Sequence, residues 1–131
     1  MTTELTLLGW VLVLAMVQIA LAATLRTMET GIWYNATARD GDVAPPGKVT
    51  ARLQRAQKNL FETLPLFAIA VLIAHVAGRH SPHTVLACQL YLGARVLYVP
   101  LYAAGVPVVR TLVWGASVAG LVMLVMAILA G

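Results

Sequence analysis

Residues 52–67 read RLQRAQKNLFETLPLF, and this stretch decides the fold because it sets charged side chains within an apolar helical pattern. Arg55, Asn59 and Glu62 follow one another at spacings of four and three residues, which stacks them on one face of a helix. Leucines and Phe67 cover the other sides. The stretch therefore predicts a long apolar helix with one polar stripe, and the stripe predicts a binding site.

The composition predicts that this helix lies in a membrane. Hydrophobic residues make up 60% of the chain and charged residues 11%, far from the balance of a soluble domain. No charged residue lies between Glu4 and Arg26 or after Arg110, so each end of the chain can span a bilayer. Two further apolar segments are each interrupted by one charge, Glu62 or Arg95. We therefore predict an all-α integral membrane protein folded as a four-helix bundle.

The chain is expected to form a single domain over residues 1–131. The predicted spans are about 5–27, 48–78, 83–104 and 107–130, and a loop rich in Gly, Asp and Pro is predicted at about 28–47. We expect the first span to be retained rather than cleaved as a signal peptide, because no Lys or Arg precedes its apolar run.

The basic residues predict the orientation in the membrane. Six of the nine Lys and Arg lie between or beside the first two spans: Arg26, Arg39, Lys48, Arg52, Arg55 and Lys58. Because loops rich in Lys and Arg stay in the cytoplasm, we expect both termini on the non-cytoplasmic side. The net charge of +4 then indicates contact with anionic lipids. No nucleic-acid partner is predicted, since no basic patch interleaved with aromatic residues occurs.

Cysteine and histidine give no sign of metal or thiol chemistry. Cys88 is the single cysteine and falls in the third apolar segment, so we expect it to be a small packing residue. The three histidines show no metal-ligand spacing, and no metal site is predicted.

A short turn after the second span predicts that spans two and three form an antiparallel hairpin. Glu62 lies 17 residues before Arg79 and Arg95 lies 16 residues after it, which places the two opposite charges at one depth. Arg95, Tyr98 and Tyr102 form their own stripe at spacings of three and four. Two polar stripes are therefore expected to face one cavity.

Two interpretations of these stripes are open. In the first, Glu62 and Arg95 only pair to join the bundle. In the second, the stripes form a site, since ionisable groups within membranes usually mark function. The number of converging groups favours the site, and basic, amide and carboxylate groups together suit a small zwitterionic ligand with several carboxylates, such as the tripeptide glutathione.

The pattern from Arg52 to Phe67, Arg-x-x-Arg-Ala-Gln-x-Asn-x-x-Glu-x-x-Pro-Leu-Phe, resembles the second-helix signature of the MAPEG family, the membrane-associated proteins in eicosanoid and glutathione metabolism. The Ala94-Arg95-x-x-Tyr98-x-x-x-Tyr102 pattern, the chain length and the Pro45-Pro46 loop agree with it. The resemblance covers almost the whole chain. It implies a bacterial inner-membrane member similar to the microsomal glutathione transferases, assembled as a homotrimer of four-helix subunits.

The resemblance also implies roles for individual residues. Glutathione would be the co-substrate, bound near the cytoplasmic side between subunits by residues of two chains: Arg55, Gln57, Asn59, Glu62, Arg95, Tyr98 and Tyr102. Arg110, aligned with a one-residue gap, resembles the arginine that stabilises the glutathione thiolate. In the alternative interpretation, Arg110 is a cytoplasmic anchor whose charged group snorkels to the membrane surface. Ala51 and Thr63 depart from the family pattern, which has an acid and an aromatic there, and such changes would reshape the pocket.

The leading functional hypothesis is a glutathione transferase or peroxidase that activates the thiol and acts on small lipophilic electrophiles dissolved in the bilayer. The alternative is a non-catalytic trimeric membrane protein that binds lipid or scaffolds a complex. An ion or solute carrier is a weaker third hypothesis, because the chain shows no inverted repeat.

Overall fold

The computed structural model describes residues 1–38 and 41–130, so Arg39 of the predicted loop lies outside the described residues. These residues form helices and no strands. The helices are α1 (Thr3–Thr30), α2 (Ile32–Ala36), α3 (Lys48–Val76), α4 (Pro82–Ala104) and α5 (Pro107–Ala130). All except α2 are long and apolar enough to cross a membrane, which confirms the all-α bundle of four spanning helices.

Local sequence signals account for the helix ends. Helix α4 begins with a capping box, in which Ser81 and Thr84 each bond the backbone N–H of the other, and Pro82 follows the cap. It ends at Gly105, whose φ of 75° lies in the left-handed region that favours glycine. Helix α2 falls within the range expected to be a loop.

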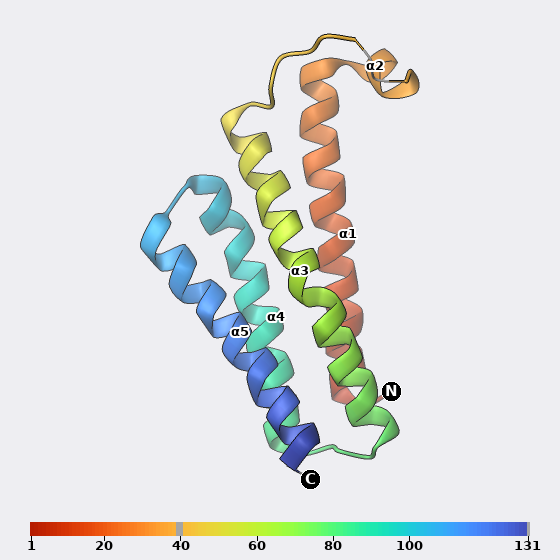
Figure 1. The fold of residues 1–131 in the computed structure, drawn as a ribbon, viewed down its shortest axis with the longest axis vertical. Helices are drawn as coiled ribbons and strands as arrows, with labels where there is room; N and C mark the ends of the chain where they lie inside the picture. The colour runs from red at the N-terminus through yellow and green to blue at the C-terminus, as the bar shows by residue number, and fades with distance from the viewer. Residues whose placement is uncertain (39–40, 131) are drawn as a thin grey trace.

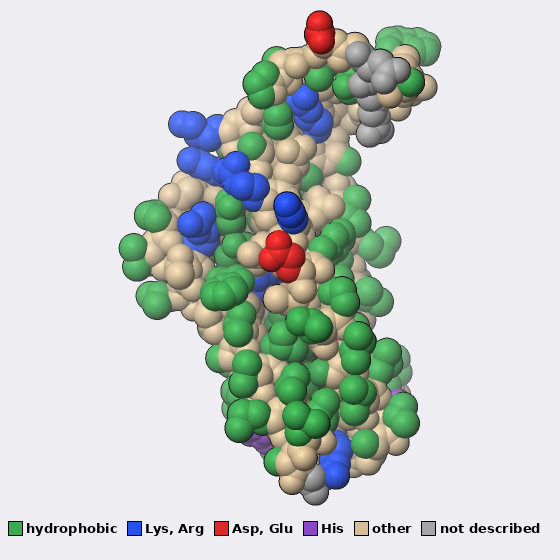
Figure 2. All heavy atoms as spheres, in the orientation of Figure 1, with side chains coloured by type: hydrophobic (Ala, Val, Ile, Leu, Met, Phe, Trp, Pro, Cys, Tyr) green, Lys and Arg blue, Asp and Glu red, His purple; other side chains and the backbone are tan. Residues whose placement is uncertain are grey.

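The long helices lie side by side along the length of the molecule, with α1 beside α3 and α4 beside α5 (Figure 1). Both termini lie at one end, and the segment that contains α2 lies at the other. Lys and Arg side chains gather in the half of the molecule nearer α2, whereas the other half of the same face is mostly apolar (Figure 2). Most of the basic side chains on this face therefore lie toward one end of the bundle, with another cation at the end that carries the termini.

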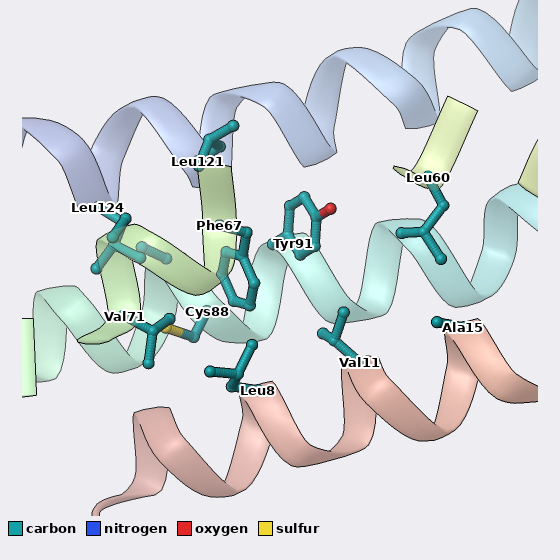
Figure 3. Packing of buried hydrophobic residues seen from close by; sticks show 12 residues of the cluster. Leu8, Val11, Ala15, Leu60, Phe67, Val71, Cys88, Tyr91, Leu121 and Leu124 are labelled. Carbon is teal, nitrogen blue, oxygen red and sulfur yellow. The ribbon is translucent and has the colours of Figure 1, made fainter. Parts of the chain in front are cut away.

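The core consists of side chains from all four long helices, with small and large residues interleaved (Figure 3). The Phe67 and Tyr91 rings stack with their centroids 4.1 Å apart, and the Tyr91 hydroxyl lies 2.8 Å from the Thr63 hydroxyl. Buried phenols need such a partner. Cys88 is fully buried among these residues, which confirms that it packs in the core.

At the end that carries the termini, a buried carboxylate ties α1 to the start of α4. Glu4 is 4% exposed and accepts a hydrogen bond of 2.6 Å from the Thr84 hydroxyl, while His80 Nδ1 lies 2.7 Å from the same carboxylate. Hydrogen bonds to a charged group are stronger than those between neutral groups. This contact fixes the end of the bundle opposite the basic side chains.

A glycine sets the distance between α4 and α5. A Cβ atom placed on Gly120 would lie 2.8 Å from the carbonyl oxygen of Ala87 and 3.0 Å from the backbone nitrogen of Tyr91. Small residues at such positions let the backbones of membrane helices approach closely. Gly115, on the same helix, has no neighbouring atom within 4 Å of the same position.

We expect Gly120→Ala to lower the stability of the bundle by about 1 to 3 kcal/mol, because the methyl group must push α4 and α5 apart. Gly115→Ala is the matched control, and it should leave stability unchanged or raise it, since alanine favours helix by about 1 kcal/mol over glycine. Thermal unfolding in detergent measures both variants. Equal unfolding temperatures for the two would contradict this account of the packing.

Candidate functional site

A polar hollow of about 200 Å³ lies between α3, α4 and α5, in the half of the molecule that carries the basic side chains. Its walls come from Arg55, Asn59, Tyr98, Tyr102, Arg110, Thr111 and Trp114. The hollow lies where the polar stripes of α3 and α4 meet, and the first turns of α5 complete its wall. Five of the residues predicted for the site therefore line one hollow.

Two hydrogen bonds join the stripe on α3 to the stripe on α4. Arg55 Nε donates to the Tyr102 hydroxyl at 3.1 Å. Arg95 Nη1 donates to Asn59 Oδ1 at 2.8 Å. Because both stripes follow the helical spacing of three and four residues, the contacts repeat one helical turn apart. These bonds fix the relative height of α3 and α4 at the hollow.

Three guanidinium groups converge on a pair of tyrosine rings. Tyr98 and Tyr102 pack edge to face with their centroids 5.4 Å apart. The Arg95 guanidinium lies 4.5 Å from the centroid of the Tyr98 ring, and the guanidinium groups of Arg110 and Arg55 lie 4.6 and 5.8 Å from that of Tyr102. Aromatic faces attract cations at these distances. The rings thus gather positive charge around the hollow.

No carboxylate in the described part of the chain forms an ion pair with these guanidinium groups, although the charge of Glu62 acts on Arg95 over a longer distance. The ion pairs within residues 1–38 and 41–130 are Arg26 with Glu29 at 3.1 Å and His80 with Glu4 at 2.7 Å. The simple pairing of Glu62 with Arg95 is therefore not formed within one subunit, because Glu62 points to the surface and Arg95 bonds an amide instead. A concave surface with an excess of positive charge attracts anions.

Arg95 does not reach the hollow itself. Its side chain is among the largest fully buried ones and the residue is only 1% exposed. Of its guanidinium nitrogens, Nη1 bonds Asn59, whereas Nε and Nη2 are buried without a hydrogen-bond partner. Arg95 is therefore connected to the hollow through its contacts with Asn59 and Tyr98, which line it.

Gln57 lies apart from the other predicted site residues. It lines a second hollow of about 280 Å³ between α1, α2 and α3. The polar residues of this second hollow are Arg26, Thr27, Asn35, Gln54 and Gln57. Residues two positions apart on a helix do not face the same way, which explains why Gln57 diverges from Arg55 and Asn59. One subunit thus carries two separate polar surfaces.

Some lining residues were not predicted from the sequence. Trp114 lies four residues after Arg110, and this spacing could have placed it on the same face of α5. Arg26 was interpreted only as an orienting charge, although it lines the second hollow. Asn35 could not be placed because it belongs to α2, which has no clear sequence signal.

Arg52 supports the turn that leads into Arg110. Its Nη1 donates to the carbonyl oxygen of Ala103 at 3.3 Å, and its guanidinium lies against Gly105. A cation near the last carbonyl groups of a helix stabilises that helix end. Arg52 thereby holds the end of α4 next to the hollow.

A profile of the MAPEG family matches residues 5–130, nearly the whole chain. No curated protein matches the chain. Four apolar helices together with this match indicate an integral membrane protein that contacts lipid.

Proposed function

The chain belongs to the MAPEG family, and on this basis we propose that it binds glutathione and activates its thiol to attack lipophilic electrophiles in the bilayer. The family includes glutathione transferases and peroxidases. One observation carries the proposal. Guanidinium groups of Arg55, Arg95 and Arg110 gather at a polar hollow, and none has an ion-pair partner among the described residues.

The chemistry of these groups suits glutathione. This tripeptide carries two carboxylates and one ammonium group, so it is anionic at neutral pH. Arg55 and Arg110 can form charge-assisted hydrogen bonds with carboxylates, for which the planar guanidinium is well shaped. Glu62 is exposed on the same face of α3, and we assign it to the ligand's ammonium group.

The sizes of the two hollows support a site shared between subunits. Volumes of about 200 and 280 Å³ fall below the usual range for pockets of this class, roughly 300 to 1,000 Å³. We therefore propose a homotrimer in which the polar hollow of one subunit, with Arg55, faces the second hollow of the next subunit, with Gln57. A head-to-tail contact of this kind closes into a ring with one complete site at each interface.

Thiol activation is assigned to Arg110. A guanidinium beside the glutathione sulfur favours the thiolate and so lowers the pKa of that thiol, which makes it a better nucleophile at neutral pH. Arg110 is half-buried at the first turns of α5 and lies against the Tyr102 ring. In our proposal this contact restrains the guanidinium at the hollow.

The lipophilic electrophile is proposed to arrive from the bilayer along α5. Trp114 lines the hollow and is 38% exposed, so its ring belongs both to the hollow and to the apolar outer surface of α5. An apolar surface that reaches a polar site offers a path from lipid to the thiolate. We further propose that the basic end of the bundle faces the cytoplasm of a bacterial inner membrane, with both termini on the opposite side.

Thiolate formation tests the proposal. We expect purified protein to give an ultraviolet difference absorbance of thiolate when glutathione is added at neutral pH, and Arg110→Ala to reduce the thiolate fraction roughly tenfold, which corresponds to one pKa unit. Arg110→Lys should retain part of the signal because it keeps the positive charge.

Two results would count against it. An unchanged thiolate signal in Arg110→Ala would remove Arg110 from the chemistry. Absence of any thiolate signal in the unaltered protein, together with absence of glutathione binding, would favour the scaffold alternative.

A further inference from the structure

The contact between Arg95 and Asn59 determines which way the Asn59 amide points. A guanidinium has hydrogen-bond donors and no acceptor, so the amide atom 2.8 Å from Arg95 Nη1 must be the carbonyl oxygen. The amide nitrogen of Asn59, with its two donors, then lies on the other side. Asn59 lines the polar hollow and is half-buried, whereas Arg95 is buried behind it.

The other walls of the hollow offer donors as well. The Tyr102 hydroxyl accepts from Arg55 Nε, which leaves its own proton available to a ligand. Arg55 and Arg110 are donors only, and so is the indole N–H of Trp114. The Tyr98 hydroxyl can turn to donate, whereas the Thr111 hydroxyl already donates to the carbonyl oxygen of Pro107 at 3.1 Å. A wall made mostly of donors matches a ligand group that only accepts hydrogen bonds.

The buried charge of Arg95 acts in the same direction. A buried guanidinium with one hydrogen bond and two unpartnered nitrogens is only partly compensated for its loss of water, by that bond, by the Tyr98 ring and by the more distant charge of Glu62. An anion in the adjacent hollow would compensate it through space.

From these observations we infer that Arg95 is a positioning residue, which holds the Asn59 amide with its N–H groups toward the hollow, so that this part of the site binds a carboxylate or carbonyl oxygen. The inference rests on the proposed function for the identity of the ligand. It assigns Arg95 no contact with that ligand.

The asparagine side chains provide a direct readout, because the chain has only two, Asn35 and Asn59. In protein labelled with isotopic nitrogen at asparagine, we expect added glutathione to shift the side-chain NH₂ resonances of Asn59. Inorganic sulfate, which offers only acceptor oxygens, should shift them in the same direction. The variant Asn35→Gln identifies which signals belong to Asn59.

Variants of Arg95 test the positioning role. The variant Arg95→Lys keeps a side chain that can only donate hydrogen bonds, so the shift of the Asn59 signals should be preserved. Arg95→Gln can donate or accept, so the Asn59 amide is free to turn, and we expect the shift to shrink and glutathione affinity to fall about tenfold. If the two variants behave alike, the positioning role is overturned.

Asn59→Asp is a second, nearly isosteric variant that should fold even if changes at Arg95 do not. We expect its unfolding temperature to stay level or rise, since a carboxylate pairs with Arg95, while glutathione affinity falls at least ~10-fold because an acceptor replaces the donors. Unchanged or higher affinity would overturn the inference.

The two probes separate failure of the inference from failure of the proposed function. If glutathione binds without shifting the Asn59 signals, the inference fails and the proposed function stands. If glutathione does not bind but sulfate shifts the Asn59 signals, and does so less in Arg95→Gln, the proposed function fails and the inference stands. If neither probe shifts the Asn59 signals, the inference fails.

Discussion

Replacing Arg55 with alanine is expected to weaken glutathione binding about 100-fold, because in the proposed shared site the ligand and the neighbouring subunit would bury this charged contact, which is exposed in the single subunit. Arg55 lines the polar hollow, and its Nε also bonds the Tyr102 hydroxyl. The variant therefore loses a direct cation and also frees a phenol that shapes the wall. Isothermal titration calorimetry of the protein in detergent measures the change.

Lys58→Ala is the matched control for this experiment. Lys58 is a cation on the same helix, it is exposed, and it lines neither hollow. Its removal changes the net charge by the same amount and should alter affinity by less than about threefold. An equal loss in the two variants would mean that Arg55 contributes only long-range charge.

Mixing two inactive variants is expected to restore binding if the site is shared between subunits. Arg55→Ala removes a cation from the first hollow, and Gln57→Glu places a negative charge in the second. In a mixed trimer, one interface joins the intact first hollow of one subunit to the intact second hollow of its neighbour. About one third of the sites should therefore regain normal affinity.

The measurement uses two affinity tags, which isolate trimers that contain both variants, followed by titration with glutathione. Each variant purified alone should bind glutathione weakly or not at all. A mixed trimer without recovered sites would show that each site lies within a single subunit, and the proposed arrangement of hollows would then be wrong.

The sequence predicted the architecture because membrane insertion imposes simple rules on it. Runs without charge between Glu4 and Arg26 and after Arg110 can only be spans, and the structure confirms a bundle of four long helices. The signature from Arg52 to Phe67 also identified the family. Cys88 was correctly expected in the core, since a lone apolar thiol in such a segment packs like a small hydrophobic residue.

The details of the site were less predictable, because helical spacing predicts which residues share one face of a helix but not which residues of the neighbouring helix they contact. Counting from the turn correctly brought the stripes of α3 and α4 together, yet it suggested Glu62 as the partner of Arg95, whereas the structure pairs Arg95 with Asn59. Two residues at the same depth in the membrane can still adopt different rotamers and contact different neighbours.

The position of Gln57 could not be read from the signature either. Arg55 and Gln57 are close in sequence and were assigned to one ligand, but they lie on two different surfaces of the subunit. For Arg55 and Gln57 to contact one ligand, two chains would have to contribute to the site, as the family resemblance implies, and the periodicity of a single chain contains no information about packing between chains.

Equilibrium binding of glutathione to the purified protein tests the central claim most directly. We predict saturable binding with a Kd in the micromolar to low millimolar range, about −4 to −8 kcal/mol, and a clear loss of affinity in Asn59→Ala. No saturable binding up to about 10 mM glutathione, or equal binding by Asn59→Ala, would contradict the account.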